Sequence, residues 1–345
     1  MVQTRGLAVT NLEAPTRERA SGRAGQEVAT GLQRDQADVA SRDLYAGSLS
    51  PGDKVVIAYL GILALLILIA RERIPSWWLL IAGHLLVIAF IALLATLHRG
   101  DSGVVMLARC WYPPLLIPLT FKELTHLIPL LRPRDFDWEL AAIDYRMFGV
   151  NPTVWLERFT HPLLTELLQL SYMAYYLLPL VLGLVLWKRG SMRQFHFLLF
   201  VVVLGFYLSY FGYIAVPAIG PRFILADQQA FPLKGVLLFE TLQAALNRAE
   251  GITRDCFPSG HTALTLLMIY YARRFHWPSY RWMLPVGSAL IIATVYLRYH
   301  YVIDVIAGAG LAALVISVAA PLYKLLGGPF HKHSTPDGVV KGNDL

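Results

Sequence analysis

The sequence predicts an all-α membrane protein, a polytopic helical bundle with a six-helix core and about two transmembrane helices before it. Two observations lead to this fold class. Of the 345 residues, 56% are hydrophobic and only 15% are charged, and the apolar residues form long runs instead of alternating faces. The net charge of +7 comes largely from Arg and Lys between these runs, which is typical of charge retained on one side of a membrane. Nucleic-acid binding is therefore a poor explanation for the charge.

Eight apolar runs approach the roughly 20 residues that are needed to cross a bilayer. We place these runs at 54–70, 77–97, 104–131, 163–187, 195–216, 259–275, 282–299 and 301–326. The third run is the weakest span, because three prolines and the charged residues Arg109, Lys122 and Glu123 interrupt it. Residues 135–160 are too polar to cross, so we expect an amphipathic segment at the membrane surface there, with a surface helix near 136–148.

The two ends of the chain differ from the rest in composition. Residues 1–50 and 327–345 lack sustained apolar periodicity, and we expect both to be disordered tails, the first of them cytosolic. The first tail has no hydrophobic core of a cleavable signal, so the first membrane segment should be retained. Residues 51–100 should then hold the two additional helices, and residues 101–326 the main membrane domain.

The basic loops predict an orientation. Two short loops, between runs four and five and between runs six and seven, carry Lys188, Arg189, Arg193, Arg273, Arg274 and Arg281. By the positive-inside rule these loops face the cytoplasm. The opposite ends of runs five to eight then face the extracytoplasmic or lumenal side. Four arginines on that side weaken this orientation without reversing it: Arg71, Arg73, Arg132 and Arg134.

Two histidines stand at those opposite ends. Residues 256–261 read Cys-Phe-Pro-Ser-Gly-His, and His300 follows His261 by 39 residues. The intervening helices, about 22 and 25 Å long, bring His300 back to the level of His261. Asp304 lies four residues after His300, so on a continuing helix its carboxylate can fix the imidazole tautomer and leave the other nitrogen as a nucleophile. A structural hydrogen bond between helices is the alternative.

The residues before His261 predict a helix start that binds an anion. Ser259 can cap the helix, Gly260 lets a phosphate approach the backbone, and the free N–H groups favour negative charge. A plain N-cap explains Ser259 and Gly260, but not a histidine directly after them. In the functional interpretation, His261 protonates the leaving oxygen and later activates the acceptor.

Arginines near the same end are candidate phosphate ligands. Prolines and glycine in residues 217–222 break the helix and deliver Arg222 to the interface, where its fixed donors match phosphate oxygens. Contact with lipid headgroups is the alternative. Arg254 and Arg298 are weaker candidates. The two cysteines, Cys110 and Cys256, form neither a disulfide framework nor a metal-binding spacing, and by default each is a small buried hydrophobe.

Residues 258–261 (Pro-Ser-Gly-His) and 295–308 (Val-Tyr-Leu-Arg-Tyr-His-Tyr-Val-Ile-Asp-Val-Ile-Ala-Gly) resemble the second and third signature motifs of the type 2 phosphatidic acid phosphatase superfamily. The resemblance covers about residues 160–326. It implies a helical bundle that uses no metal and no other cofactor. It further implies a phosphohistidine intermediate on His300, an orienting acid at Asp304 and a general acid/base at His261.

The departures from the family pattern indicate a subfamily. The first motif has a Lys seven residues before an Arg-Pro pair, whereas here Ala215 takes the Lys position and the order is Pro221-Arg222. In the third motif, Ala293 and Thr294 replace a Ser-Arg pair. Together with residues 143–149, this pattern resembles the branch of inositol phosphorylceramide synthases and related inositolphosphotransferases. That branch implies transfer of a phosphate-linked headgroup from a membrane phospholipid to a lipid alcohol.

Two other functions stay open at this point. A lipid phosphate or polyprenyl diphosphate phosphatase would use the same residues with water as the acceptor. A non-catalytic transporter or scaffold would only bind phosphate. The intact set of His261, His300 and Asp304 argues against the second, since a binding site does not need an aligned nucleophile and acid.

Overall fold

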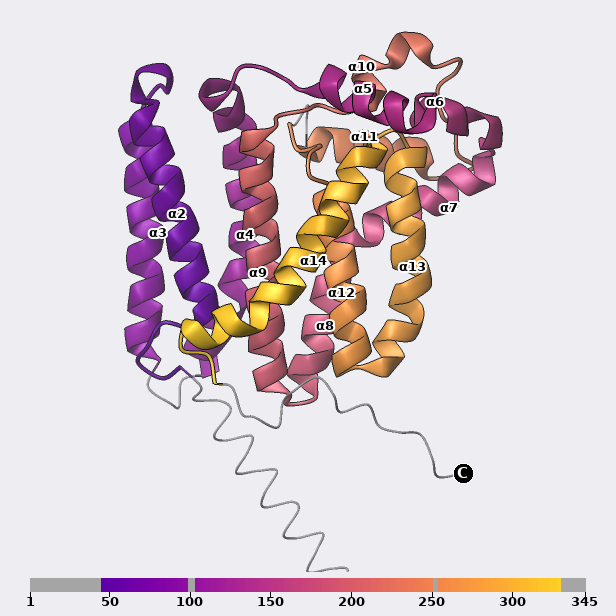
Figure 1. The fold of residues 1–345 in the computed structure, drawn as a ribbon. Coiled ribbons are helices and arrows are strands. Elements are labelled where there is room, and N and C mark those ends of the chain that lie inside the picture. Colours follow the sequence, from indigo (N-terminus) through magenta and orange to yellow (C-terminus); the bar gives the residue numbers. More distant parts are fainter. Residues whose placement is uncertain (1–44, 99–102, 251–253, 330–345) are drawn as a thin grey trace, which may run out of the picture. The chain divides into compact units, whose positions relative to one another are not determined.

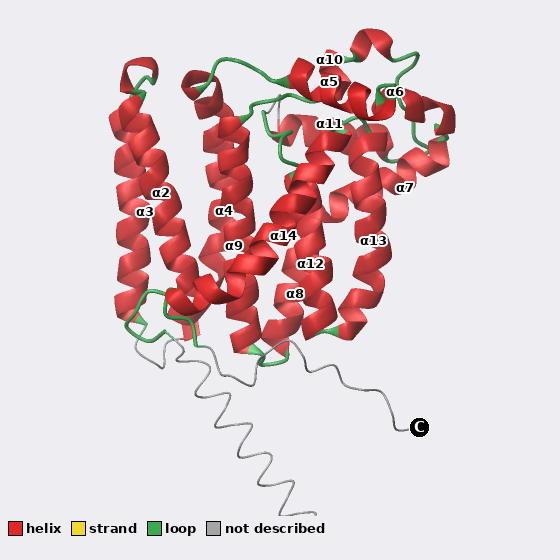
Figure 2. Cartoon of the chain, in the orientation of Figure 1, coloured by secondary structure: helices red, strands yellow, loops and turns green. Residues whose placement is uncertain are grey.

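The computed structural model describes residues 45–98, 103–250 and 254–329, and every regular element in these ranges is helical (Figure 1). Figure 2 shows helices and connecting loops and no strand in this part of the chain. The predicted all-α fold class is therefore confirmed. Most of the two expected tails lies outside the described residues. Residues 45–50, which we had assigned to the first tail, contact the bundle, since the buried Tyr45 hydroxyl lies 2.5 Å from that of Tyr323.

One group of helices follows the predicted apolar runs. They are α2 (Pro51–Ile69), α3 (Trp77–Leu97), α4 (Gly103–Leu131), α7 (Pro162–Met173), α8 (Leu177–Lys188), α9 (Met192–Ala215), α12 (Gly260–Phe275), α13 (Trp277–Tyr296) and α14 (Val302–Leu325). The other α-helices are α5 (Asp137–Phe148), α6 (Pro152–Trp155), α10 (Pro221–Ile224) and α11 (Phe239–Glu250). A helix thus occupies the region where we expected a surface helix.

Among the described residues, six segments are long and apolar enough to cross a membrane: α2, α3, α4, the stretch Pro162–Lys188, α9 and α14. The protein is therefore a multi-pass integral membrane protein. The runs predicted at 259–275 and 282–299 are also helices, but they fall outside these six, because α12 has only 16 residues and α13 is less apolar. Both pack within the bundle, where α12 contacts α8, α9, α13 and α14.

Helix α4 is continuous, although it contains four prolines and the charged residues that weakened its prediction. Two of those charges have partners on the preceding helices. Arg109 donates to Asp53 of α2 at 2.8 Å, and Glu123 accepts from His84 of α3 at 2.8 Å. Polar partners of this kind let charged residues enter a membrane segment. The contacts from α2 and α3 therefore support α4 as a spanning helix.

One predicted run is broken in a way that matters for the site. The run at 163–187 divides into α7 and α8, joined by a 3₁₀ turn at Ala174–Tyr176. Such tighter turns inside a helical stretch often mark functional positions. Here the turn changes the direction of the chain, and α7 packs against α11 and α13.

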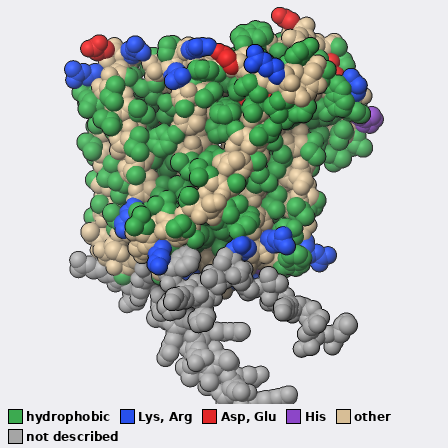
Figure 3. All heavy atoms as spheres, in the orientation of Figure 1, with side chains coloured by type: hydrophobic (Ala, Val, Ile, Leu, Met, Phe, Trp, Pro, Cys, Tyr) green, Lys and Arg blue, Asp and Glu red, His purple; other side chains and the backbone are tan. Residues whose placement is uncertain are grey.

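Four short helices, α5, α6, α10 and α11, lie across one end of the bundle, and we call them with their connecting loops the cover layer (Figure 1). The α8–α9 and α12–α13 turns lie at the opposite end. Figure 3 shows apolar side chains over the middle of the visible face and Lys and Arg side chains towards both ends. This distribution fits a bundle with its apolar belt in the bilayer.

Two carboxylates fix α5 of the cover layer to the bundle. Asp137 accepts from the N–H groups of Ile219 and Gly220 at 3.0 and 2.8 Å. Asp144 accepts from the first two N–H groups of α14 at 2.7 and 2.9 Å, where the helix dipole favours negative charge. Burial raises the pKa of both carboxyl groups, and these N–H donors oppose the rise. The chain before α10 and the start of α14 are thus held by one helix.

We expect the two ends of the bundle to lie on opposite sides of the membrane. Single cysteines at exposed positions, Arg189→Cys in the α8–α9 turn and Asp227→Cys in the cover layer, test this with a membrane-impermeant maleimide on sealed vesicles. The native Cys110 and Cys256 are buried, so they should stay unlabelled and provide the background. Labelling of both introduced cysteines from the same side would contradict the arrangement.

Candidate active site

His300 lies in the tight turn that joins α13 to α14. The carbonyl oxygen of Thr294 accepts from the N–H groups of Tyr299 and His300 at 3.0 and 2.9 Å, so the chain wraps back over the end of α13. Arg298 adopts a left-handed conformation in this turn, with φ of 64°. The turn directs the His300 ring into the bundle, where only 4% of the residue is exposed.

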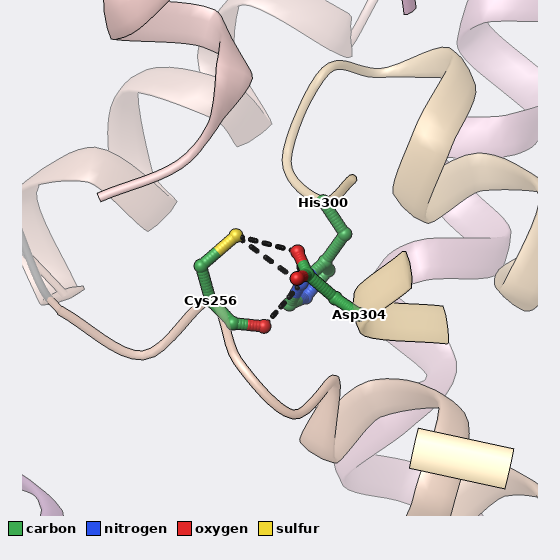
Figure 4. Close-up of side chains that lie close together, drawn as sticks. All are labelled: Cys256, His300 and Asp304. Carbon is green, nitrogen blue, oxygen red and sulfur yellow. Dashed lines mark hydrogen bonds and ion pairs between the residues drawn. The ribbon is translucent and has the colours of Figure 1, made fainter. Parts of the chain in front are cut away.

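The two nitrogens of His300 have different neighbours. Nδ1 lies 2.9 Å from the carbonyl oxygen of Cys256 (Figure 4), and Nε2 lies 3.5 Å from Nδ1 of His261. A carbonyl only accepts hydrogen bonds, so Nδ1 carries a proton. In the neutral imidazole, Nε2 then carries the lone pair and faces the second histidine.

Asp304 completes this cluster and faces Nδ1 of His300, although the two residues do not share a helix as we had expected. Its Oδ2 atom lies 3.5 Å from His300 Nδ1 and accepts from the Cys256 thiol at 2.9 Å and from the Tyr301 N–H at 2.8 Å. His300 precedes α14, whereas Asp304 lies in its first turn, so the two are not four apart on one helix. Cys256 therefore binds both members of the pair, His300 through its carbonyl and Asp304 through its thiol.

Cys256, His300 and Asp304 also offer sulfur, nitrogen and oxygen atoms within 4.8 Å of one another, a donor set that suits a transition metal such as zinc. Each donor already has a hydrogen-bonding partner in the protein. Burial, followed by the neighbouring Asp304 carboxylate, raises the pKa of the Cys256 thiol well above its usual value, so the thiol stays a proton donor. Hydrogen bonds thus account for the geometry of the cluster.

The motif at 258–261 begins α12 as predicted. The Ser259 side chain accepts from the Thr262 N–H at 3.2 Å, and the Ser259 N–H donates to the backbone carbonyl of Asp304 at 3.0 Å. The second contact joins the two sequence motifs directly. The Tyr213 hydroxyl occupies the space that a Cβ atom would take at Gly260, so a larger residue at this position would displace Tyr213 or the helix start.

His261 is held between two tyrosines from the α7–α8 stretch. The ring of Tyr172 stacks at 4.4 Å between centroids, and that of Tyr175, in the 3₁₀ turn, lies at 4.1 Å. Nε2 of His261 is buried and has no hydrogen-bonding partner among the described residues. The ring is therefore fixed in place while one nitrogen is left for another group.

A cavity of about 420 Å³ extends from His261 between α4, α8 and α9. Aromatic and aliphatic side chains form most of its wall. Its polar lining, apart from tyrosine hydroxyls, consists of Lys122, Asp255 and His261. Such a cavity suits a ligand with an apolar body and a polar end next to His261.

The three candidate arginines have different partners. Arg254 binds both oxygens of Asp135, at 2.5 and 3.1 Å. Arg298 donates to Glu157 at 2.9 Å and to two further oxygens in the cover layer.

Arg222 donates to the neutral amide oxygen of Asn247 at 2.8 Å and lies over the rings of Phe223 and Tyr299. In the described ranges, none of the ion pairs involves Arg222. Its charge is thus the least compensated of the three.

Several residues that shape this site were not predicted from the sequence. Cys256 is the first residue of the motif that we quoted, yet its role as a bridge depends on contacts 44 and 48 residues away. No sequence pattern distinguishes Tyr172 and Tyr175 from the other residues of their apolar run. A pattern does mark Asp137 and Asp144, since a spacing of seven puts two carboxylates on the same face of a helix.

Comparisons with known proteins agree with the motifs. A family model described as PAP2 superfamily, the type 2 phosphatidic acid phosphatases named above, matches residues 138–318. A PA-phosphatase related-family protein of Dictyostelium discoideum is 27% identical over 188 residues, which cover 48% of this chain and 33% of the relative. The chain thus spans about a third of the length of that relative.

No solved structure matches the chain. The matched range of the family model contains both histidines, Asp304 and most of the cover layer, and it makes up more than half of the chain. The protein described here is therefore a member of the PAP2 superfamily.

Proposed function

We propose that this protein transfers a phosphate-linked headgroup, such as inositol phosphate, from a membrane phospholipid to a lipid alcohol, through a phosphohistidine on His300. Membership in the PAP2 superfamily gives the coarser activity, phosphatase or phosphotransferase chemistry on lipid phosphates. The observation that carries the proposal is the pairing of His300 Nε2 with His261 at 3.5 Å, while the Cys256 carbonyl holds Nδ1. This pairing supports a nucleophile beside an acid/base group.

The reaction has two displacements at phosphorus. In the first, the lone pair of His300 Nε2 forms a P–N bond, the P–O bond to the donor's lipid alcohol breaks, and His261 gives its proton to the leaving oxygen. In the second, the acceptor hydroxyl loses its proton to His261 and forms a new P–O bond as the P–N bond breaks. The positive charge that develops on His300 is stabilised by the Asp304 carboxylate, both through space and through the Cys256 bridge.

The phosphate needs hydrogen-bond donors during both steps. We assign this part to Arg222, whose charge is the least compensated of the three arginines, and to the N–H groups of Gly260 and His261. Arg254 was also a candidate, but Asp135 already binds its guanidinium. The Ser259 N–H donates to the Asp304 carbonyl, so Ser259 acts as the cap of this helix start.

Burial of the site supports transfer over hydrolysis. His261 is 7% exposed, His300 4% and Asp304 0%, and the adjoining cavity is mainly apolar. Exclusion of water protects a reactive intermediate from hydrolysis, and an apolar cavity suits a lipid alcohol as the acceptor. The basic α8–α9 and α12–α13 turns lie at the opposite end of the bundle, which by the positive-inside rule supports a site on the extracytoplasmic or lumenal face.

The decisive experiment separates the two possible acceptors. Purified protein is incubated with phosphatidylinositol labelled in its phosphate, with and without ceramide or a diacylglycerol whose acyl chains differ in length from those of the donor, and the products are separated. We expect a new labelled lipid that depends on the added alcohol. Release of inositol phosphate or phosphate at the same rate without an alcohol would favour a phosphatase instead.

Rapid quenching and peptide mass analysis should identify the intermediate. We expect an adduct on His300 in the wild type, of the mass of the phosphorylated headgroup for a transferase and of phosphate alone for a phosphatase. His300→Ala should abolish turnover, and His261→Ala should reduce it by about 10²–10⁴-fold, the usual contribution of general acid/base catalysis. Turnover should persist in a chelator. Substantial activity of His300→Ala would refute the mechanism.

Arg222 and Thr294 provide a matched comparison of the phosphate ligands. The Thr294 hydroxyl donates to the carbonyl of Ile291 at 2.7 Å, so it is already used inside α13. We expect Arg222→Lys to lower kcat/KM by about tenfold or more, because lysine loses the bidentate guanidinium. Thr294→Ala should stay within about threefold, since it removes one local hydrogen bond. Greater damage from the threonine change would mean that the phosphate lies elsewhere, nearer Arg254 or Arg298.

A further inference from the structure

The cavity beside His261 changes from apolar to polar along the helix axis. On α4, the lining residues Trp111, Pro118 and Lys122 are seven and four apart and so share one face. On α9, the lining extends from Phe195 to Tyr213, a rise of about 27 Å. Both helices run towards the cover layer (Figure 1). Lys122 and Tyr213 thus lie towards the same end as the candidate site. Trp111 and Phe195 lie towards the other end, nearer the starts of α4 and α9.

Lys122 is unusual for its position. It lies nine residues before the end of α4, inside a segment that is long and apolar enough to span a membrane. A charge in such a segment is costly and usually serves a function. Among the residues that line the cavity, Lys122 is the one lysine or arginine. Asp255 lines the same cavity and would repel an anion, so an ammonium group there also offsets this carboxylate.

The candidate site lacks cations that its chemistry needs. Ala215 and Thr294 stand where related motifs carry Lys and Arg. The nearby Arg254 and Arg298 are bound to Asp135 and Glu157. Arg222 approaches from the cover layer, on the Tyr299 side of the turn. A negatively charged lipid phosphate beside His261 would therefore have Arg222, the least compensated of the three arginines, on the side of the cover layer and Lys122 on the side of the cavity.

We propose that Lys122 binds the phosphate of the lipid substrate from within the cavity and replaces the cations missing from the two motifs. This inference rests on the proposed function, since it assumes a lipid phosphate beside His261. The four-carbon stem of lysine can lie along the apolar wall while its ammonium reaches the polar end. Lys122 is then a binding residue that distinguishes lipid phosphates from uncharged lipids of the same chain length.

The test measures binding instead of turnover. All proteins carry His300→Ala, so that no substrate is consumed. Binding of dioctanoyl phosphatidic acid and of dioctanoylglycerol, in the same detergent, is measured by calorimetry. Lys122→Met removes the charge and keeps most of the stem, Lys122→Gln is a second neutral variant, and Lys122→Arg keeps the charge. Lys324→Met, at the exposed far end of α14, is the matched control for loss of one lysine.

We expect Lys122→Met and Lys122→Gln to weaken phosphatidic acid binding by about tenfold or more, as for loss of a charge-assisted hydrogen bond. Binding of dioctanoylglycerol should not change. Lys122→Arg and Lys324→Met should bind phosphatidic acid with an affinity within about threefold of the parent's, because both keep a positive charge at position 122. Unchanged phosphatidic acid binding in the neutral variants, equal loss of both lipids, or no phosphatidic acid binding by the parent would overturn the inference. Failure to trap phosphohistidine in the wild type would refute the proposed reaction and leave this binding result standing.

Discussion

The structure depends on one constraint, that polar groups inside an apolar bundle must find their partners within the protein. Arg109 shows how completely this is met: its guanidinium donates to Asp53 and to the carbonyls of Tyr45 and Ser48, all at 2.8 Å. Tyr112 donates to the other oxygen of Asp53 at 2.6 Å. Removing one member of such a pair leaves a buried charge without a partner, which is far more costly than the net value of the pair. The same constraint gives the candidate site its rigidity.

The candidate site leaves two of its buried polar atoms unsatisfied. Within the described residues, His261 Nε2 and Asp304 Oδ1 are buried and have no hydrogen-bonding partner, although each of these side chains is otherwise firmly held. Buried polar atoms without partners are rare and call for an explanation. A substrate that supplies the missing contact to His261 explains one of them. The other, Oδ1 of Asp304, would help to stabilise the positive charge that develops on His300.

Most of the fold could be predicted from the sequence, because hydropathy acts locally and each apolar run became helical, although one run divided into α7 and α8. The partners of the charges in α4 could not, since Asp53 and His84 come from other helices. The three residues at the centre of the site, His261, His300 and Asp304, were found from their motifs, and the structure brings them together. The Cys256 bridge was not predicted, because a single cysteine in a sequence does not reveal which distant carboxylate its thiol will meet.

Helix α7 links the cover layer to the candidate acid/base group. Near its start, Glu166 accepts from four consecutive N–H groups at 236–239, which lead into α11. One and a half turns later, Tyr172 stacks on His261. The same helix of 12 residues thus holds both residues 236–239 and the ring that stacks on His261. A displacement of α7 that accompanied entry of a headgroup would also move Tyr172, which would couple access to the site to the alignment of its acid/base group.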